Sequence, residues 1–212
     1  MASWEKNVNL AAKESDLYFL YHIGLHLSWA LLYIVAVFNP KIKKFVEGRR
    51  SVQAYLEKVI PKEQAVIWIH AASLGEYEQG LPVIEKLKKD YPGHFILITF
   101  FSPSGYEVRK NTKAADAVCY LPMDTKRNVE RFLGTVRPVL AIFIKYEVWP
   151  NYLKSLQSRK VPVVLISAIF SRRQVYFKWY GRFMRKALRR FTKIFVQNEE
   201  SQKLMHEIGI KW

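Results

Sequence analysis

The sequence predicts a doubly wound α/β fold, meaning a parallel sheet with helices on both faces, preceded by a hydrophobic helix. Six short, mainly apolar runs recur after residue 64, and their apolar residues are consecutive instead of alternating with polar ones. Continuous hydrophobicity indicates strands that are covered on both faces. Amphipathic segments separate the runs, and their lengths suit the right-handed crossovers that join parallel strands.

Residues 17–38 form the first predicted element, an apolar segment with no Asp, Glu, Lys or Arg over its 22 positions. About 20 apolar residues are enough to cross a bilayer core. His22 and His26 lower its hydrophobicity, so it either spans the membrane, lies in the interface, or packs as a hydrophobic helix on its own domain. We therefore predict an amino-terminal tail at 1–16 and a membrane-anchor or membrane-associated helix at 17–40.

Residues 41–64 are predicted to form a basic linker or helix, since lysines and arginines follow the apolar segment directly. By the positive-inside rule, this bias places the rest of the chain on the cytoplasmic side. The 212-residue chain carries a formal charge of +16, from 34 Lys and Arg against 18 Asp and Glu. This excess implies an anionic partner, which composition leaves open among phosphate-bearing lipid, a membrane surface and nucleic acid.

A Rossmann-like domain is predicted over residues 65–212, with its ligand beyond the carboxyl ends of the strands, where the loops gather. Cys119 is the single cysteine; it is interpreted as a buried core residue, and having no disulfide partner it fits a reducing compartment. The six predicted strands are the runs 65–71, 95–101, 117–122, 139–144, 161–168 and 193–197.

The first strand ends in a turn, "HAASLGEY", that places Glu76 at the start of the next helix. A carboxylate at this position faces the expected ligand crevice. An acidic residue in the first turn of a helix also complements the helix dipole. Spacing alone leaves both interpretations of Glu76 open.

The loop after the second strand, "TFFSPSGYE", carries Ser102, Ser104 and Gly105 into a helix. Small hydroxyl residues and exposed backbone N–H groups at such a junction are candidates for holding a phosphate. Ordinary helix N-capping by Ser102 or Ser104 is the alternative. The two lone glycines of these loops make neither a dinucleotide fingerprint nor a Walker loop.

The loop after the fourth strand, "IKYEVWPN", repeats the pattern, with Glu147 at the junction and Pro150 suited to a first helical turn. Two carboxylates on adjacent loops at one edge of a sheet indicate a shared site. The alternative is that Glu147 only accepts hydrogen bonds from backbone donors and orients its loop.

A basic stripe is predicted on a helix over "GRFMRKALRRFTK", because at 100° per residue the basic residues fall on one side and the apolar residues on the other. Such a stripe binds anionic head groups or acceptor phosphates, or is the solvated face of a packed helix. Its members are Arg182, Arg185, Lys186, Arg189, Arg190 and Lys193.

Five segments occur together in one order and spacing: "WIHAASLGEYEQGLPVIEKL", "LPMDTKRNVERFLGTVRP", "KYEVWPNYLKSL", "VPVVLISAIFSRRQ" and "FVQNEESQKLMHEIGI". In the order and spacing of these segments, the sequence resembles the amino-terminal half of the 3-deoxy-D-manno-octulosonic acid (Kdo) transferases of lipopolysaccharide synthesis. The apolar amino-terminal segment resembles their membrane anchor. The resemblance covers residues 17–210.

The resemblance implies a GT-B glycosyltransferase at the inner (cytoplasmic) membrane. It would be inverting, independent of metal and of any cofactor, and would transfer Kdo from CMP-Kdo to lipid IVA. The resemblance assigns Glu76, in the "GE" motif, as the base that takes the proton of the acceptor hydroxyl. It assigns Glu147 to acceptor orientation or support of the site, with Ser102, Ser104 and Gly105 as weaker candidates for binding polar groups.

The sequence departs from the family pattern at "SAIFSRR", where many members read Asn-Ala-Arg-Leu-Ser. Acceptor contacts of that Asn and Arg do not carry over to Ser167 and Ile169, so Arg172 or Arg173 is the candidate replacement. Full transferases of this kind bind most of the CMP-sugar through a second Rossmann-like domain. The chain is therefore expected to be the acceptor-binding half, with the carboxy-terminal donor domain absent.

The competing class is a non-catalytic module that binds anionic lipid or nucleic acid through the same basic surface. The sequence carries no RNA-binding or helix-turn-helix signature, so a nucleic acid partner is not expected. The expected partners are lipid IVA, an anionic membrane, and CMP-Kdo bound through the second domain.

Overall fold

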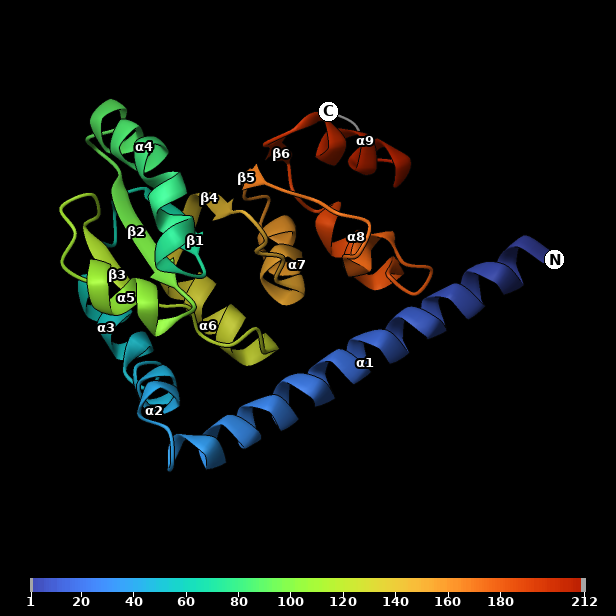
Figure 1. Ribbon diagram of the computed structural model, residues 1–212, viewed down its shortest axis with the longest axis horizontal. Coiled ribbons are helices and arrows are strands. Elements are labelled where there is room, and N and C mark those ends of the chain that lie inside the picture. The colour runs from blue at the N-terminus through green and yellow to red at the C-terminus, as the bar shows by residue number, and fades with distance from the viewer. Residues whose placement is uncertain (1, 211–212) are drawn as a thin grey trace.

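The computed structural model describes the backbone of residues 2–210 and the side chains of residues 17–210. Its centre is a six-stranded sheet in the order β3-β2-β1-β4-β5-β6, with every neighbouring pair parallel (Figure 1). Each predicted apolar run forms a strand, so the predicted doubly wound fold is confirmed. The strands are β1 Val66–Ala71, β2 Phe95–Phe100, β3 Ala117–Tyr120, β4 Pro138–Ile144, β5 Val163–Ala168 and β6 Lys193–Val196.

Helices cover both faces of the sheet, and the side chains of β1 show how. Successive residues of a strand point to opposite faces, so Ile67 and Ile69 join one buried cluster with residues of α4, while Trp68 joins the other. The centre of the Trp68 ring system lies 4.9 Å from the ring centre of Phe132 in α6 and 5.4 Å from that of Tyr152 in α7. The helices of these two layers are α3 Val52–Val59, α4 Leu74–Asp90, α5 Pro103–Arg109, α6 Lys126–Val136 and α7 Pro150–Ser158.

The amino-terminal helix α1, Ala2–Ala36, crosses beside the domain and leads through α2, Pro40–Glu47, into the sheet layers (Figure 1). Because α1 is continuous, residues 2–16 of the predicted tail belong to the same helix as the apolar segment. The predicted linker at 41–64 contains α2 and α3. The third hydrophobic cluster joins Leu25 and Trp29 of α1 to Phe45 of α2.

Helix α1 contacts the domain along one side and exposes large apolar side chains along the other. Phe19, Leu20, Leu27 and Leu31 are each at least 60% exposed. The helix therefore packs on its own domain along one side only, and its apolar segment is not buried as a whole. By length and composition, Leu17–Ala36 is able to cross a membrane.

The predicted helix through Lys193 is wrong, since α8 spans only Arg182–Leu188 and Lys193 begins β6. The chain must leave the helix to reach the sheet, where the Thr192 N–H donates to the Val163 carbonyl at 2.7 Å. Two members of the basic stripe donate hydrogen bonds to backbone carbonyl oxygens. Arg185 donates to two carbonyl oxygens of the segment around the 3₁₀ helix η1, Val175–Phe177, and Arg189 donates to a carbonyl after α9, Glu199–Glu207.

Candidate active site

Glu76 lies in the first turn of α4, directly beyond the carboxyl end of β1, and is only 8% exposed. One of its carboxylate oxygens, Oε2, accepts the backbone N–H of Ala72 at 2.5 Å. The carboxylate is thereby held against the end of the strand. Burial raises the pKa of Glu76, and the negative charge of Glu147 raises it further. A carboxylate with a raised pKa is a stronger base than an ordinary glutamate.

Glu147 follows β4 and is held by two side chains. Its Oε2 accepts the indole N–H of Trp149 at 2.7 Å and lies 3.0 Å from Nε2 of His70. A carboxylate only accepts hydrogen bonds, so Nε2 carries the hydrogen that joins this pair. The partners of Glu147 are side chains and not the backbone donors of the alternative interpretation.

His70 is fully buried in β1 and is fixed at both ring nitrogens. Nδ1 lies 2.9 Å from the hydroxyl and 3.0 Å from the carbonyl oxygen of Thr99, on the neighbouring strand β2. The Thr99 hydroxyl accepts the indole N–H of Trp68 at 2.8 Å. Hydrogen bonds therefore run from the core of the sheet to Glu147, so the carboxylate is held by rigid elements.

Two residues with left-handed backbone border the same edge of the sheet. Lys145, after β4, has a φ of 70°, and Ser167, near the end of β5, has a φ of 54°. Residues other than glycine rarely adopt this conformation, and such residues gather at functional sites. Lys145 is also close enough to Glu76 for its charge to oppose the rise in the pKa of that carboxyl.

The serine loop behaves as the alternative interpretation predicts. The Ser102 hydroxyl accepts the backbone N–H of Ser104 at 3.3 Å and caps α5. Gly105 lies against the Phe100 ring, where a Cβ atom would come within 2.2 Å of a ring carbon. Gly105 is therefore required by packing, and these contacts account for the loop without a ligand.

The basic candidates lie in the part of the domain formed by η1, α8 and α9. Arg172 is exposed and pairs with Glu207 of α9 at 2.6 Å. Arg173 is exposed as well. Arg190 is partly buried, and its Nε has no hydrogen-bond partner among the described residues. The structure brings Glu76 and Glu147 together, and none of the hydrogen bonds or ion pairs of these arginines involves either glutamate.

Asp124, in the loop between β3 and α6, is fully buried and was not predicted as important. Its carboxylate accepts the backbone N–H groups of Asn151 and Tyr152 at 3.0 and 2.9 Å and the hydroxyl of Tyr21 at 2.7 Å. Burial raises the pKa of Asp124 to about 6. One side chain thus ties the start of α7 to helix α1.

Comparison with known proteins places the sequence in a family. Residues 46–212 match the family model described as 3-deoxy-D-manno-octulosonic-acid transferase (kdotransferase). The chain is similar to the 3-deoxy-D-manno-octulosonic acid transferase of Haemophilus influenzae, with 39% identity over 68% of this chain and 33% of the relative. It is also similar to the protein of that name from Rickettsia felis, with 33% identity over 69% of this chain and 32% of the relative. For the protein of that name from Aquifex aeolicus, the identity is 32% over 74% of this chain and 42% of the relative.

The matching family model and these relatives are all named as 3-deoxy-D-manno-octulosonic acid transferases, which defines the class of protein to which the parallel α/β domain is related. The chain belongs to the 3-deoxy-D-manno-octulosonic acid transferase family and corresponds to its amino-terminal part. It spans 32% to 42% of the length of these three relatives.

Proposed function

We propose that this domain binds lipid IVA and acts in the transfer of Kdo from CMP-Kdo to that acceptor. The observation that carries the proposal is the pair of glutamates at the carboxyl edge of the sheet. Glu76 is buried and has a raised pKa, and it lies beside a Glu147 fixed by His70 and Trp149. CMP-Kdo would be held mainly by the region of the relatives that this sequence does not cover.

In the proposed reaction an acceptor sugar hydroxyl attacks the anomeric carbon of Kdo. The new C–O bond forms as the bond from that carbon to the CMP phosphate breaks, and CMP leaves with the electron pair. Glu76 takes the proton of the hydroxyl, and Oε1 serves this purpose because Oε2 is held by Ala72. Glu147 orients the acceptor. Because the donor itself carries the leaving group, the proposal assigns no metal or cofactor to the chain.

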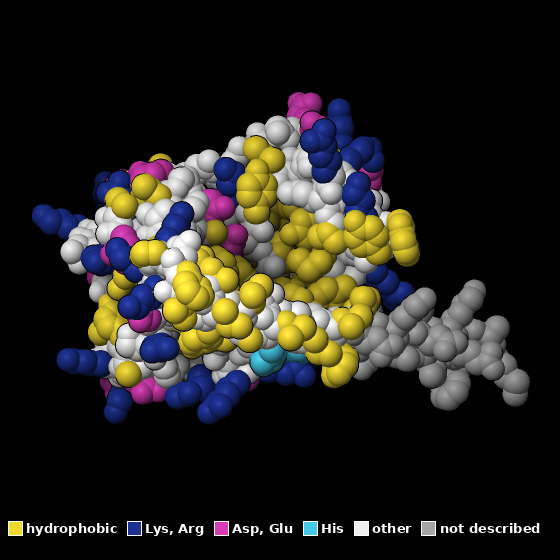
Figure 2. All heavy atoms as spheres, turned by 60° about the horizontal axis from the view of Figure 1, so that its bottom comes forward, with side chains coloured by type: hydrophobic (Ala, Val, Ile, Leu, Met, Phe, Trp, Pro, Cys, Tyr) yellow, Lys and Arg dark blue, Asp and Glu magenta, His cyan; other side chains and the backbone are white. Residues whose placement is uncertain are grey.

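We place the domain on the cytoplasmic side of the inner membrane, with α1 as its membrane contact. Figure 2 shows hydrophobic side chains gathered along α1 and lysine and arginine side chains around the border of that face. An apolar stripe with a basic border suits an anionic bilayer surface.

The proposed function is tested by incubating the protein, extended by the region that the relatives carry beyond this sequence, with lipid IVA and CMP-Kdo. Mass spectrometry of the lipid should show the mass of added Kdo, and CMP should be released in equal amount. A protein that binds vesicles but leaves lipid IVA unchanged would support the non-catalytic binding module instead.

Replacing Glu147 by Gln should shift the acidic limb of the pH–rate profile to lower pH. The wild-type limb should lie above the ordinary glutamate range, because Glu76 must lose its proton to act and its pKa is raised. Removing the negative charge of Glu147 removes one cause of that rise. Measuring kcat against pH checks this, and a limb that stays in place would contradict the predicted coupling between the carboxylates.

Replacing Leu27 and Leu31 by Gln should weaken binding to neutral phosphatidylcholine vesicles by about tenfold or more, since each leucine loses apolar burial in the interface. These side chains are 66% and 60% exposed, so the fold should tolerate the change. Vesicle flotation measures the effect. The matched control replaces Val108 and Val139, which are exposed on the domain, by Gln. This control variant should bind the vesicles as the wild type does. If both variants lost vesicle binding equally, α1 would not be the membrane contact.

A further inference from the structure

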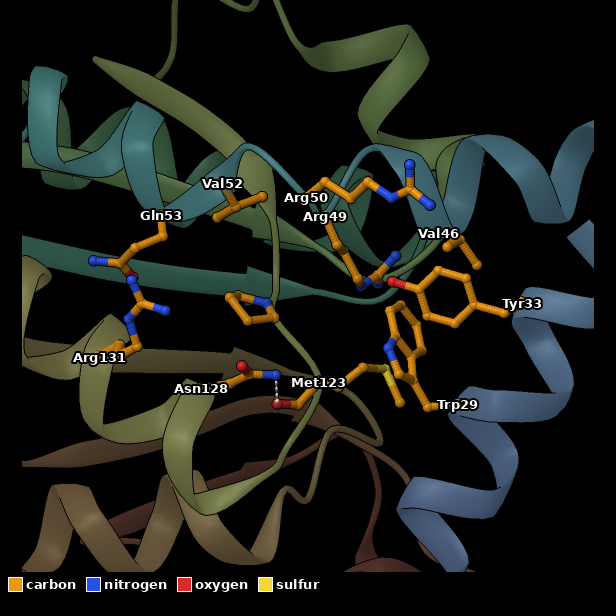
Figure 3. A pocket seen from close by; sticks show the side chains of 11 residues that line it. Trp29, Tyr33, Val46, Arg49, Arg50, Val52, Gln53, Met123, Asn128 and Arg131 are labelled. Atoms are coloured by element: carbon orange, nitrogen blue, oxygen red, sulfur yellow. Dashed lines mark hydrogen bonds between the residues drawn. The ribbon is translucent and has the colours of Figure 1, made fainter.

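A pocket of about 220 Å³ lies between α1, the connection from α2 to α3, and α6. This is room for a phosphate group and several water molecules. Figure 3 shows Trp29 and Tyr33 extending from α1, Arg49 and Arg50 from the α2–α3 connection, and Arg131 from α6. The residues that line this pocket include neither glutamate of the active site.

The charge of the pocket is one-sided, because three arginines line it and no aspartate or glutamate does. Arg50 lies over the Tyr33 ring at 5.7 Å, a contact that leaves its charge uncompensated. Within residues 17–210, neither Arg50 nor Arg131 forms an ion pair. Guanidinium groups that line a cavity without carboxylates beside them favour an anionic ligand.

Arg49 also lines the pocket, and this buried cation has no carboxylate partner among residues 17–210. Its guanidinium donates to the carbonyl oxygens of Leu121, Phe45 and Phe101 at 2.9, 2.7 and 2.6 Å. It lies 3.7 Å from the centre of the Phe45 ring. Burial lowers the pKa of Arg49 to about 9. Buried charges are normally paired, so an anion in this pocket would supply the missing opposite charge.

The position of the pocket indicates where that anion comes from. Trp29 and Tyr33 belong to the helix whose outer side exposes a row of apolar side chains. Tryptophan and tyrosine favour the level of lipid head groups, between the hydrocarbon and the water. If the exposed side of α1 enters a bilayer, the pocket lies at the depth of the lipid phosphates. Arginine is suited to them because its fork of donors matches phosphate oxygens.

We propose that this pocket binds the phosphate of a membrane lipid head group, attracted by the positive charges of Arg50 and Arg131 beside the buried Arg49. A lipid bound there would join α1 to the domain at the membrane surface. The inference rests on the proposed membrane attachment and not on the transfer reaction, so lipid binding is measured without any assay of activity.

The test compares two variants of the whole chain that each lose two positive charges. Arg50→Gln with Arg131→Gln changes the pocket. Lys44→Gln with Arg127→Gln changes exposed residues of α2 and α6 that do not line it. Flotation is measured with phosphatidylcholine vesicles and with vesicles that also contain phosphatidylglycerol. The pocket variant should lose about tenfold of its preference for the anionic vesicles. The control should keep most of its preference. Equal loss in the two variants would overturn the proposal.

A second arm distinguishes a lipid from a free anion. Inorganic phosphate and glycerol phosphate are added as competitors at constant ionic strength. They should not displace the wild-type protein from anionic vesicles, because neither supplies the apolar contact of a lipid with α1. The proposal would be overturned if inorganic phosphate displaced the wild-type protein from the vesicles but did not displace the pocket variant. That result would assign the pocket to free phosphate instead of a lipid.

Discussion

Replacing Glu76 by Gln should lower the turnover of Kdo transfer by about 100-fold or more, which is the range for loss of a positioned general base. Glutamine keeps an oxygen that accepts the Ala72 N–H, so the turn should keep its structure. What the variant loses is the oxygen that takes a proton. The effect should appear in kcat under saturating CMP-Kdo and lipid IVA, with a smaller change in KM.

The matched control is Glu78→Gln on the same helix. Glu78 is exposed and pairs with Arg109 at 2.6 Å, which is a surface interaction of small energetic value. The turnover of the Glu78→Gln variant should stay within about twofold of that of the wild type, as is usual for a surface substitution away from the site. Near-normal turnover of the Glu76 variant would leave that residue with its helix-dipole role alone.

The strands were predictable because buried parallel strands leave a local signal, a run of apolar residues between polar helices. β3 shows this well, since four consecutive buried residues, Ala117–Tyr120, make the whole strand. The end of α8 was not predictable from such a signal. The helical pattern of basic and apolar residues continues past Leu188, and the helix ends there only because the chain must pair with β5.

The site was predictable only where a carboxylate stands at the end of a strand. Glu76 and Glu147 carry that signal, whereas His70 and Arg49 do not, because their roles depend on partners 77 and 72 residues away in the sequence. A weak local signal existed for His70, since a titratable residue in an otherwise apolar strand is unusual. Arg49 was grouped with the basic residues that follow the anchor, and only the fold shows it to be buried.

Replacing Asp124 by Ala should lower the free energy of unfolding by about 3 kcal/mol or more. Two buried N–H groups at the start of α7 would lose their acceptor, and each unsatisfied group costs about 1–3 kcal/mol. Tyr21 of α1 would lose its partner as well. Urea unfolding of the whole chain in a mild detergent measures the loss. Asp90→Ala, which removes an exposed pair with Lys86, should cost less than about 0.5 kcal/mol.

Asp124→Asn removes the group that titrates, but it also turns one accepting oxygen into an NH2 donor that faces a backbone N–H. Its overall stability should therefore be lower, and the comparison with the wild type concerns only the change of stability with pH. In the wild type the pKa of Asp124 is raised from 3.8 to about 6 by burial. Between these values the folded state binds more protons than the unfolded state, so stability falls as the pH rises through this window. The asparagine variant lacks that contribution, and its stability should fall less from pH 4 to 6 than that of the wild type. If the free energy of unfolding changed equally with pH in the two proteins, the pKa of Asp124 would be the same in the folded and unfolded states, and the prediction would be wrong.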